Sequence, residues 1–253
     1  MSASRRLVFC LFKIVFRSVT AASSSQPLVA CTEVTRRYDS DSSAFSSGGR
    51  SVTALESVSL SVAGGEVVGV AGPSGSGKST LLHLLAGLDS PTAGAIEVCG
   101  TTVGSLPSRR RTAFRRENVG MVFQRFHLLP ALTARENVAL PLIQAGAARS
   151  ERQSRASELL DAVGLADRES HYPNGLSGGE QQRVAIARAL AADPAVVIAD
   201  EPTGELDRET GEQVLDSLTD IATDRAIVIA SHDEYTLSRT DRVIKLRDGR
   251  RET

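Results

Sequence analysis

The sequence predicts an α/β fold in which a parallel core sheet is joined to an N-terminal antiparallel β subdomain and an inserted helical subdomain. Two continuous apolar runs, residues 67–71 and 195–199, are typical of strands buried on both faces of a parallel sheet. In contrast, Val58, Leu60 and Val62 alternate with serines and predict a strand with one buried face. A chain of 253 residues, 41% of them hydrophobic and 23% charged, is long enough to bury the core of such a domain.

The antiparallel region is expected over residues 28–62, ahead of the parallel strands. Within it, residues 39–50 are rich in Ser, Gly and Asp, a composition that indicates a mobile loop longer than a short hairpin turn. Helix-forming segments follow at residues 81–86 and 181–192, and another apolar strand is expected at 226–230. Strands that alternate with helices in this way predict a parallel sheet.

The first apolar strand runs into a glycine-rich segment that matches the phosphate-binding pattern GxxxxGK[ST]. Its members are Gly72, Pro73, Ser74, Gly75, Ser76, Gly77, Lys78, Ser79 and Thr80. The glycines let successive backbone N–H groups point at phosphate oxygens, with the N-terminus of a helix behind them. In such a loop Lys78 reaches the β- and γ-phosphates, the Ser79 hydroxyl binds Mg²⁺, and Thr80 closes over the α-phosphate. A glycine-rich turn without a ligand is the alternative, which the flanking strand and helix disfavour.

The second apolar strand ends in two carboxylates, Asp200 and Glu201. Because ligands of open α/β sheets bind at the carboxyl ends of the strands, both are expected beside the phosphate loop. Asp200 can then hold the Mg²⁺ shell, and Glu201, past the strand end, can polarise a water for attack on the γ-phosphate. The alternative is a buried strand that ends in two solvated acids.

A helix is expected to begin at Ser177, which with Glu180 fits a capping box. An ordinary helix start is therefore one interpretation. Gly178 and Gly179 favour another, because a glycine costs about 1 kcal/mol in a helix and leaves backbone N–H groups open to an anion. We expect this helix end to meet phosphate.

The inserted helical subdomain is expected over about residues 125–183. Two further capping boxes predict helix starts within it, one formed by Thr133 with Glu136 and one by Ser150 with Gln153.

These motifs, in this order, resemble those of the ATP-binding subunits of ABC transporters. Residues 176–180 match the signature that separates this family from other P-loop NTPases. Gln124 matches the glutamine loop of the family, Asp207 its dimer-contact loop and His232 its switch histidine. The resemblance covers residues 28–253 and implies the ABC ATPase fold.

The resemblance also implies a site that is complete only in a dimer or pseudo-dimer of ATPase subunits. The γ-phosphate held by Lys78 of one chain would be contacted in trans by residues of the other: Ser177, Gly178, Gly179 and Asp207. ATP and Mg²⁺ are the implied ligands. The implied catalytic residues are Glu201, His232 and Gln124, and the implied metal ligands are Ser79, Gln124 and Asp200.

Members of the family usually stack an aromatic side chain on adenine, and Tyr38 is the best match in this chain. The long segment at residues 39–50 leaves a second interpretation open, in which Tyr38 only closes an edge strand.

Three segments, residues 123–130, 132–138 and 199–204, resemble a subgroup of the family, the lipoprotein-release and macrolide-export type. There the ATPase dimerises on ATP and drives a membrane permease, so a peripheral position at the cytoplasmic face of the cell membrane is implied. In the family the helical insertion receives the permease, so residues near 126–142 are expected to face the partner. Subdomain core is the alternative for the apolar side chains in that segment.

Other functions are possible in the same family. A close relative implies an alternative, the ATPase of a non-transport mechanotransmission complex that regulates cell-wall hydrolysis. ABC ATPases that act on DNA or ribosomes usually carry long coiled coils, zinc fingers or two fused ATPase domains, and the sequence carries none of these. Glu201 and His232 disfavour a regulatory module that binds ATP without turnover.

The composition adds a few exclusions. A net charge of −1 gives no general attraction to nucleic acid, so none is expected as a partner. Cys10, Cys31 and Cys99 form no CxxC pair, which argues against a disulfide framework or a zinc site and agrees with a reducing cytoplasm. No apolar run approaches the roughly 20 residues of a membrane-spanning helix.

Residues 1–27 are expected to be an extension outside the domain. Three interpretations of residues 5–22 stay open: a translation start further along the chain, an amphipathic helix that lies in a membrane surface, and a weak signal peptide. Lys13 interrupts the apolar segment that a signal peptide needs.

Overall fold

The computed structural model describes residues 26–39, 51–220 and 224–252. The N-terminal segment at 5–22 and nearly all of the loop expected at 39–50 therefore lie outside the described residues. The strands are β1 (Val29–Asp39), β2 (Ser51–Val62), β3 (Val67–Ala71), β4 (Ala93–Val98), β5 (Thr101–Thr102), β6 (Val119–Val122), β7 (Val196–Asp200), β8 (Ala226–Ala230), β9 (Arg242–Arg247) and β10 (Arg250–Arg251). The helices are α2 (Lys78–Leu85), α3 (Ser108–Asn118), α4 (Ala134–Gln144), α5 (Arg149–Ala162), α6 (Gly178–Leu190), α7 (Arg208–Thr219) and α8 (Glu234–Ser238), with 3-10 turns η1 (Val103–Ser105), η2 (Ala166–Arg168) and η3 (Pro173–Gly175).

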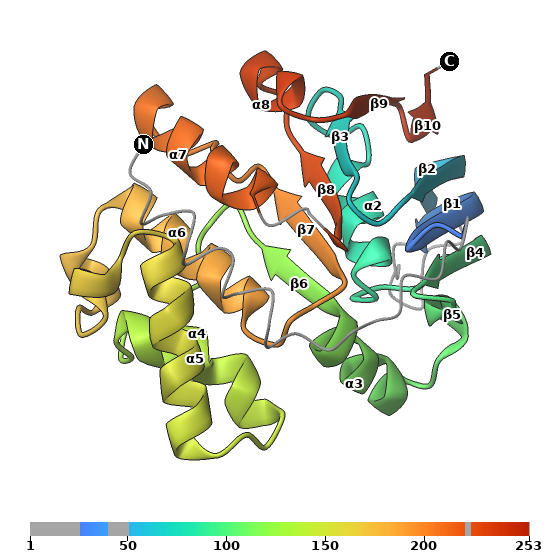
Figure 1. The fold of residues 1–253 in the computed structure, drawn as a ribbon. Helices are drawn as coiled ribbons and strands as arrows, with labels where there is room; N and C mark the ends of the chain where they lie inside the picture. Colours follow the sequence, from blue (N-terminus) through green and yellow to red (C-terminus); the bar gives the residue numbers. More distant parts are fainter. Residues whose placement is uncertain (1–25, 40–50, 221–223, 253) are drawn as a thin grey trace, which may run out of the picture.

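The described strands form two sheets (Figure 1). One has the order β10-β9-β3-β8-β7-β6, and within it β9, β3, β8, β7 and β6 pair in parallel. The other has the order β2-β1-β4-β5 and is antiparallel. The α/β fold with both kinds of sheet is confirmed.

The central parallel strands β3, β7 and β8 are buried on both faces, as their unbroken apolar sequences predicted. Val196 and Ile198 of β7 belong to one hydrophobic core, and Val197 and Ala199 belong to another. Successive side chains of a strand point to opposite faces, so the two cores lie on the two faces of this sheet. Each core is covered by a different set of helices.

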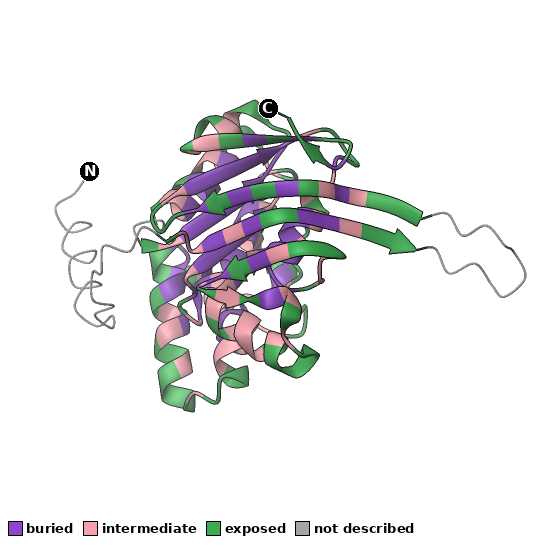
Figure 2. Ribbon diagram, turned by 90° about the vertical axis from the view of Figure 1, so that its right-hand side faces the viewer, coloured by how far each residue is buried: buried purple, intermediate pink, exposed green. Residues whose placement is uncertain are grey.

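Helix α2 packs in the first core, together with the buried face of the antiparallel sheet. Its buried leucines are Leu81, Leu82, Leu84 and Leu85. Val58, Leu60 and Val62 of β2 are buried in the same core, which confirms the predicted alternation. Along β1 and β2, buried and exposed residues form bands in Figure 2.

Helices α4, α5, α6 and α7 contribute to the second core, on the other face of the parallel sheet. Figure 1 shows α2 and α6 on opposite sides of β7 and β8. This separation decides which parts of the predicted site one chain can bring together.

The antiparallel sheet extends beyond the predicted region at residues 28–62. Strand β4 pairs with β1 and β5 pairs with β4, although both follow α2 in the sequence. Ile96 and Val98 are buried while Glu97 between them is exposed, so an alternation was present in the sequence. An alternation this short did not by itself reveal which sheet the strand joins, because that pairing is non-local.

Two of the three predicted capping boxes form. Thr133 accepts a hydrogen bond from the Glu136 backbone N–H, and Glu136 accepts one from the backbone N–H of Thr133. The box predicted for Ser150 is wrong, because the N-cap of α5 is Ala148, two residues earlier, and the helix begins at Arg149. Ser150 lies inside the first turn, where a hydroxyl cannot act as the N-cap.

The different places of Thr133 and Ser150 give a matched pair of substitutions. We expect Thr133→Ala to lower the free energy of unfolding by about 1 kcal/mol, because it removes a side-chain acceptor at the N-cap. We expect Ser150→Ala to change it by less than about 0.5 kcal/mol, because the site is exposed and alanine is a good helix former. Urea unfolding of both variants, followed by circular dichroism, checks the difference.

Within the described residues, no helix is both long enough and apolar enough to cross a membrane.

Candidate functional site

The predicted phosphate loop joins β3 to α2, in the strand-to-helix context that its sequence requires. Gly77 precedes the helix with φ 101°, and a Cβ there would lie 2.6 Å from the carbonyl oxygen of Ala54. A side chain is therefore excluded by both conformation and space. Within the described residues, a Cβ on Gly75 would meet nothing within 4 Å, so these residues leave open space on that side of the loop. The buried Ser76 hydroxyl has no hydrogen-bond partner in the same part of the chain.

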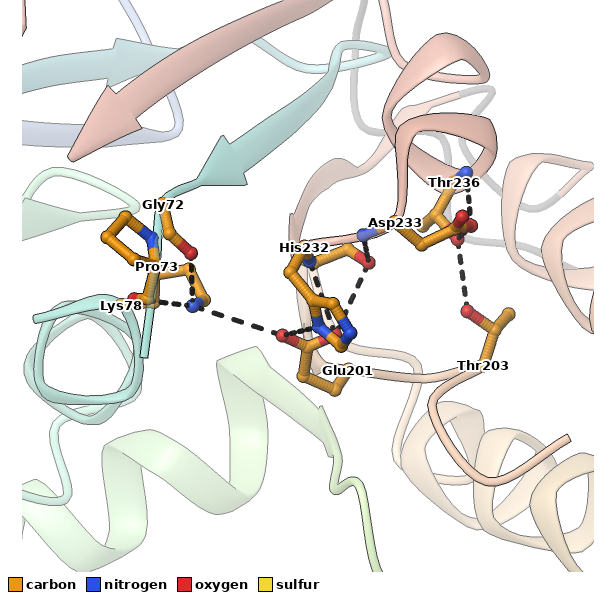
Figure 3. Close-up of polar contacts among 9 residues, drawn as sticks. Gly72, Pro73, Lys78, Glu201, Thr203, His232, Asp233 and Thr236 are labelled. Carbon is orange, nitrogen blue, oxygen red and sulfur yellow. Dashed lines mark hydrogen bonds and ion pairs between the residues drawn. The ribbon is translucent and has the colours of Figure 1, made fainter. Parts of the chain in front are cut away.

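Lys78 begins α2, and its side chain folds back over the loop (Figure 3). Its Nζ donates to the carbonyl oxygens of Gly72 at 2.7 Å and Pro73 at 3.2 Å. It also lies 4.0 Å from Oε1 of Glu201, and both side chains are about one-tenth exposed. The ammonium group is therefore placed between the phosphate loop and the carboxylate that follows β7.

Asp200 ends β7, and its carboxylate accepts a hydrogen bond from the Ser79 hydroxyl of α2. Burial raises the pKa of Asp200 above its ordinary value, and the nearby charge of Glu201 acts in the same direction. The hydrogen bond from Ser79 and the positive charge of Lys78 oppose the rise. A half-buried carboxyl group whose pKa is raised is suited to a cation that compensates its charge.

Glu201 follows the strand end with φ 47°, a left-handed conformation that costs free energy in a residue with a side chain. Two backbone hydrogen bonds hold this turn, from Glu201 N to Ala230 O and from Gly204 N to Glu201 O. The turn aims the carboxylate at the end of β8. There Nδ1 of His232 lies 2.9 Å from Oε1, and the Ser231 hydroxyl lies 3.3 Å from Oε2. Glu201 and His232 are thus in direct contact in one chain.

Gln124 is placed at the same end of the sheet, just after β6. A Cβ on Gly204 would lie 3.6 Å from Nε2 of Gln124 and 3.5 Å from Cβ of Glu201. The amide therefore sits beside the turn that carries the carboxylate. Its side chain is exposed, so it is free to meet a ligand from the open side of the site.

Tyr38 lies near the end of β1, and its side chain is 39% exposed. The phenol donates to Asp89 at 2.9 Å, and the Arg36 guanidinium lies 4.4 Å from the ring centroid. Tyr38 pairs across the sheet with Val52, two residues before the Ala54 carbonyl that contacts Gly77. This places an exposed aromatic side chain close in the fold to the phosphate loop.

Ser177 caps α6 by the predicted capping box with Glu180. Gly178 and Gly179 form the first turn. Because α6 covers the opposite face of the parallel sheet from α2, the structure does not bring these residues to Lys78 of the same chain.

Gly179 also has a packing reason to be glycine. A Cβ there would lie 1.9 Å from Cγ2 of Thr210 on α7. We expect Gly179→Ala to destabilise the fold by about 1–3 kcal/mol through overpacking. Adding Thr210→Ser removes Cγ2 and keeps a hydroxyl, so the double variant should recover most of the loss. Thermal unfolding of both variants, with Thr210→Ser alone as control, checks this.

Asp207 is the N-cap of α7 and accepts hydrogen bonds from Thr210 N at 3.0 Å and from the Thr210 hydroxyl at 2.7 Å. These two bonds lower the pKa of Asp207. The Asp207 carboxylate is thus hydrogen-bonded within its own chain, although the residue is exposed at the surface.

The sequence interpretation missed several polar groups around the two carboxylates. Thr203 and the buried Thr236 exchange a hydrogen bond at 3.0 Å, and Asp233 caps α8 through Thr236. The buried Gln182 of α6 donates to the carbonyl oxygen of Pro202 at 2.9 Å. Asp233 and Thr236 carry the spacing of an N-cap, so that part could have been found.

Comparison with known families agrees with this geometry. The family model described as ABC transporter matches residues 55–204. This range contains the phosphate loop, Gln124, the segment at 176–180 and both carboxylates.

Individual relatives are similar over most of the chain. The macrolide export ATP-binding/permease protein MacB of Bradyrhizobium diazoefficiens is 47% identical over 226 residues, which cover 89% of this chain and 34% of the relative. An uncharacterized ABC transporter ATP-binding protein of Thermotoga maritima is 50% identical over 200 residues and covers 79% of this chain and 86% of its own length. The chain thus spans about a third of the length of the MacB relatives it matches.

A solved structure is similar as well. The dimeric post-hydrolysis state of the ATP-binding cassette MJ0796, bound to ADP and Pi, superposes with a TM-score of 0.79 at 40% identity. The match covers 89% of this chain and 97% of that one.

Proposed function

Because the chain belongs to the ABC transporter family, we propose that it binds and hydrolyses ATP and so acts as the motor subunit of a membrane transporter. The observation that carries the proposal is the convergence of four side chains at one end of the parallel sheet. They are Lys78, Asp200, Glu201 and His232. A cation for phosphate, a carboxylate for a metal and a carboxylate–histidine pair for water activation are the parts that phosphoryl transfer needs.

The phosphate loop supports a nucleotide as the ligand. Gly72, Gly75 and Gly77 have the positive φ angles that such a loop uses to turn N–H groups toward a phosphate, and the described residues leave open space beside Gly75. In the same loop, the buried Ser76 hydroxyl has no partner among the described residues. Tyr38 supplies an exposed ring near the loop, so we propose that it stacks on adenine. The MJ0796 cassette, which has this fold, is bound to ADP and Pi.

Mg²⁺ fits the oxygen ligands around Asp200. Ser79 and Asp200 are already hydrogen-bonded to each other, and Gln124 lies beside the turn of Glu201. These three would hold the ion, which when bound neutralises charge on the phosphates. The chain contributes the position of the two side-chain oxygens and the raised pKa of a carboxyl group that gains from a nearby cation.

The raised pKa of Asp200 gives a test of the metal site that does not depend on activity. A carboxyl group whose folded pKa is raised stabilises the fold at low pH, and this contribution is lost as the pH rises through the folded value. Near neutral pH Mg²⁺ should offset that loss. We expect Mg²⁺ to raise the melting temperature of the ADP-bound chain, and to do so far less in Asp200→Asn. The exposed Asp161→Asn on α5 is the control for loss of one carboxylate.

The composite site supports a dimer as the active form. One chain holds the phosphate loop and the start of α6 on opposite faces of the parallel sheet. We propose that a second ATPase subunit presents Ser177, Gly178, Gly179 and Asp207 to the γ-phosphate. ATP then bridges the two subunits, and hydrolysis removes that bridge and shifts the population toward the open pair. The MJ0796 cassette of the same fold is dimeric.

The partner is proposed to be a permease, and the chain to sit as a peripheral subunit at the cytoplasmic face of the membrane. The MacB relatives are ATP-binding/permease proteins, and this chain spans about a third of their length. A groove of about 280 Å³ lies between α3, the start of β6 and the ends of α4 and α6. Leu88, Met121 and Phe123 line it together with Arg116 and Arg188, so it offers apolar and basic contacts to a helix of the permease. Export of macrolides, lipoproteins or peptides is the proposed direction and cargo class.

The experiment is purification of the tagged chain from detergent-solubilised membranes of its host, followed by identification of what accompanies it. We expect a permease to copurify, and Phe123→Asp in the groove to abolish copurification without affecting ADP binding. Recovery only with ribosomes or DNA-repair proteins would overturn the transporter assignment.

A further inference from the structure

We propose that Thr236 is a positioning residue that, through Thr203 and Asp233, fixes the turn of Glu201 against the loop of His232. This inference rests on the proposed function, because it assigns the role to the ATP-hydrolysing site. Thr236 is fully buried in α8 and lies outside the direct contacts of the candidate site. Its hydroxyl joins two chain segments that leave neighbouring strands.

The hydroxyl of Thr236 has its single proton committed. It donates to Oδ2 of Asp233 at 2.8 Å, and the same oxygen accepts the Thr236 backbone N–H at 2.8 Å. The contact of 3.0 Å to the Thr203 hydroxyl must therefore run the other way, with Thr203 as donor. The two hydroxyls and the carboxylate form a directed chain that ends on a charged acceptor, where hydrogen bonds are strongest.

A second series of hydrogen bonds leads from Asp233 back to Glu201, the proposed general base. The backbone N–H of Asp233 donates to the Ser231 hydroxyl at 3.1 Å, and this hydroxyl donates to Oε2 of Glu201 at 3.3 Å. Figure 3 shows Asp233, Thr236 and Thr203 to the right of His232 and Glu201, which lie against each other. Because Thr203 follows Glu201 by two residues, the bonds close a ring around both turns.

The ring explains how a strained turn keeps its position. Glu201 has a left-handed backbone conformation, which persists only when its surroundings determine it. On one side of this turn the Glu201 carboxylate contacts His232, in the loop that follows β8. On the other side the hydrogen bond between Thr203 and Thr236 joins the turn to α8. The pair of hydroxyls therefore limits how far Glu201 and His232 can separate.

The test compares Thr236→Val, which keeps the shape and removes the hydroxyl, with Thr236→Ser, which keeps the hydroxyl. We expect Thr236→Val to lower kcat for ATP roughly tenfold, with little change in KM or in ADP affinity, because the residue touches no ligand. Thr236→Ser should restore kcat to within about twofold of the original chain. Thr203→Val should resemble Thr236→Val, and the double variant should be no slower than either, because both break one ring.

A second readout does not need hydrolysis. We expect the ring-proton NMR signal of His232, assigned by its loss in His232→Gln, to move in Thr236→Val and to stay in place in Thr236→Ser. The signals of His83, His127 and His171 should stay in both. If the unsubstituted chain lacked ATPase activity, the proposed function would be wrong. The NMR comparison would still show whether the Thr236 hydroxyl positions His232.

Three results would overturn the inference. One is an unchanged kcat and His232 signal in Thr236→Val, even with a lower melting temperature, since that would show a packing role only. Another is an equal loss of kcat in Thr236→Ser and Thr236→Val, which would show that the effect comes from the shape of the side chain and not from its hydroxyl. The third is a loss of kcat in the Thr203→Val/Thr236→Val double variant that equals the combined losses of the two single variants.

Discussion

Glu201→Gln should give a chain that binds ATP and forms a stable dimer but hydrolyses almost no ATP. The Glu201 carboxylate is the group placed to polarise water, and general-base catalysis contributes about 10²–10⁴-fold to rate. Glutamine keeps the size of the side chain and loses the basic oxygen. We therefore expect kcat to fall by roughly two to four orders of magnitude.

We expect the stable dimer as a result of the same substitution. When the γ-phosphate persists, it continues to bind donors from two subunits, so the closed pair accumulates. Removal of one negative charge 4.0 Å from Lys78 also favours the binding of a polyanion. Sedimentation velocity in Mg-ATP measures the dimer, and a coupled assay measures turnover. Glu97→Gln, an exposed site on β4, is the matched control and should leave both unchanged. A Glu201→Gln chain that turned over ATP at the original rate would contradict the assigned role.

Loss of the Lys78 ammonium should have the opposite effect on binding. Lys78 is one-tenth exposed and donates to two backbone carbonyls of the loop, from which it can turn to phosphate oxygens. A hydrogen bond to a charged group contributes about 1.5–3 kcal/mol, so Lys78→Ala should weaken ATP binding roughly 10- to 150-fold. The ATP-dependent dimer should then disappear at nucleotide concentrations that saturate the original chain.

Lys245 provides the control for this substitution. It is the other lysine of the described residues and lies exposed on β9. We expect Lys245→Ala to bind ATP as the original chain does, by titration calorimetry. An equal loss in both variants would indicate a general charge effect, and the phosphate role of Lys78 would be wrong.

Much of the site was predictable because its parts are local in sequence. The phosphate loop is a continuous segment whose glycines, lysine and hydroxyls carry their own spacing, and the structure places it between β3 and α2 as expected. The same holds for Ser177 with Glu180, which form a capping box whose geometry depends on residues three apart.

What could not be predicted depends on contacts between distant segments. The contact of Glu201 with His232 spans two strands, and the register of β7 and β8 decides whether the two side chains meet. The bond between Thr203 and Thr236 is of the same kind and had no signal in either segment alone. One local pattern gave a wrong prediction, since Ser150 fits a capping box but α5 begins at Arg149 after Ala148.

The central claim is that hydrolysis occurs at a site shared by two chains. The most direct measurement is the ATPase rate per chain at a series of chain concentrations, with the dimer fraction measured by sedimentation at each one. We expect the rate per chain to rise in proportion to the dimer fraction and to approach zero where the chain is monomeric. A constant rate per chain across concentrations at which sedimentation changes from dimer to monomer would contradict the account.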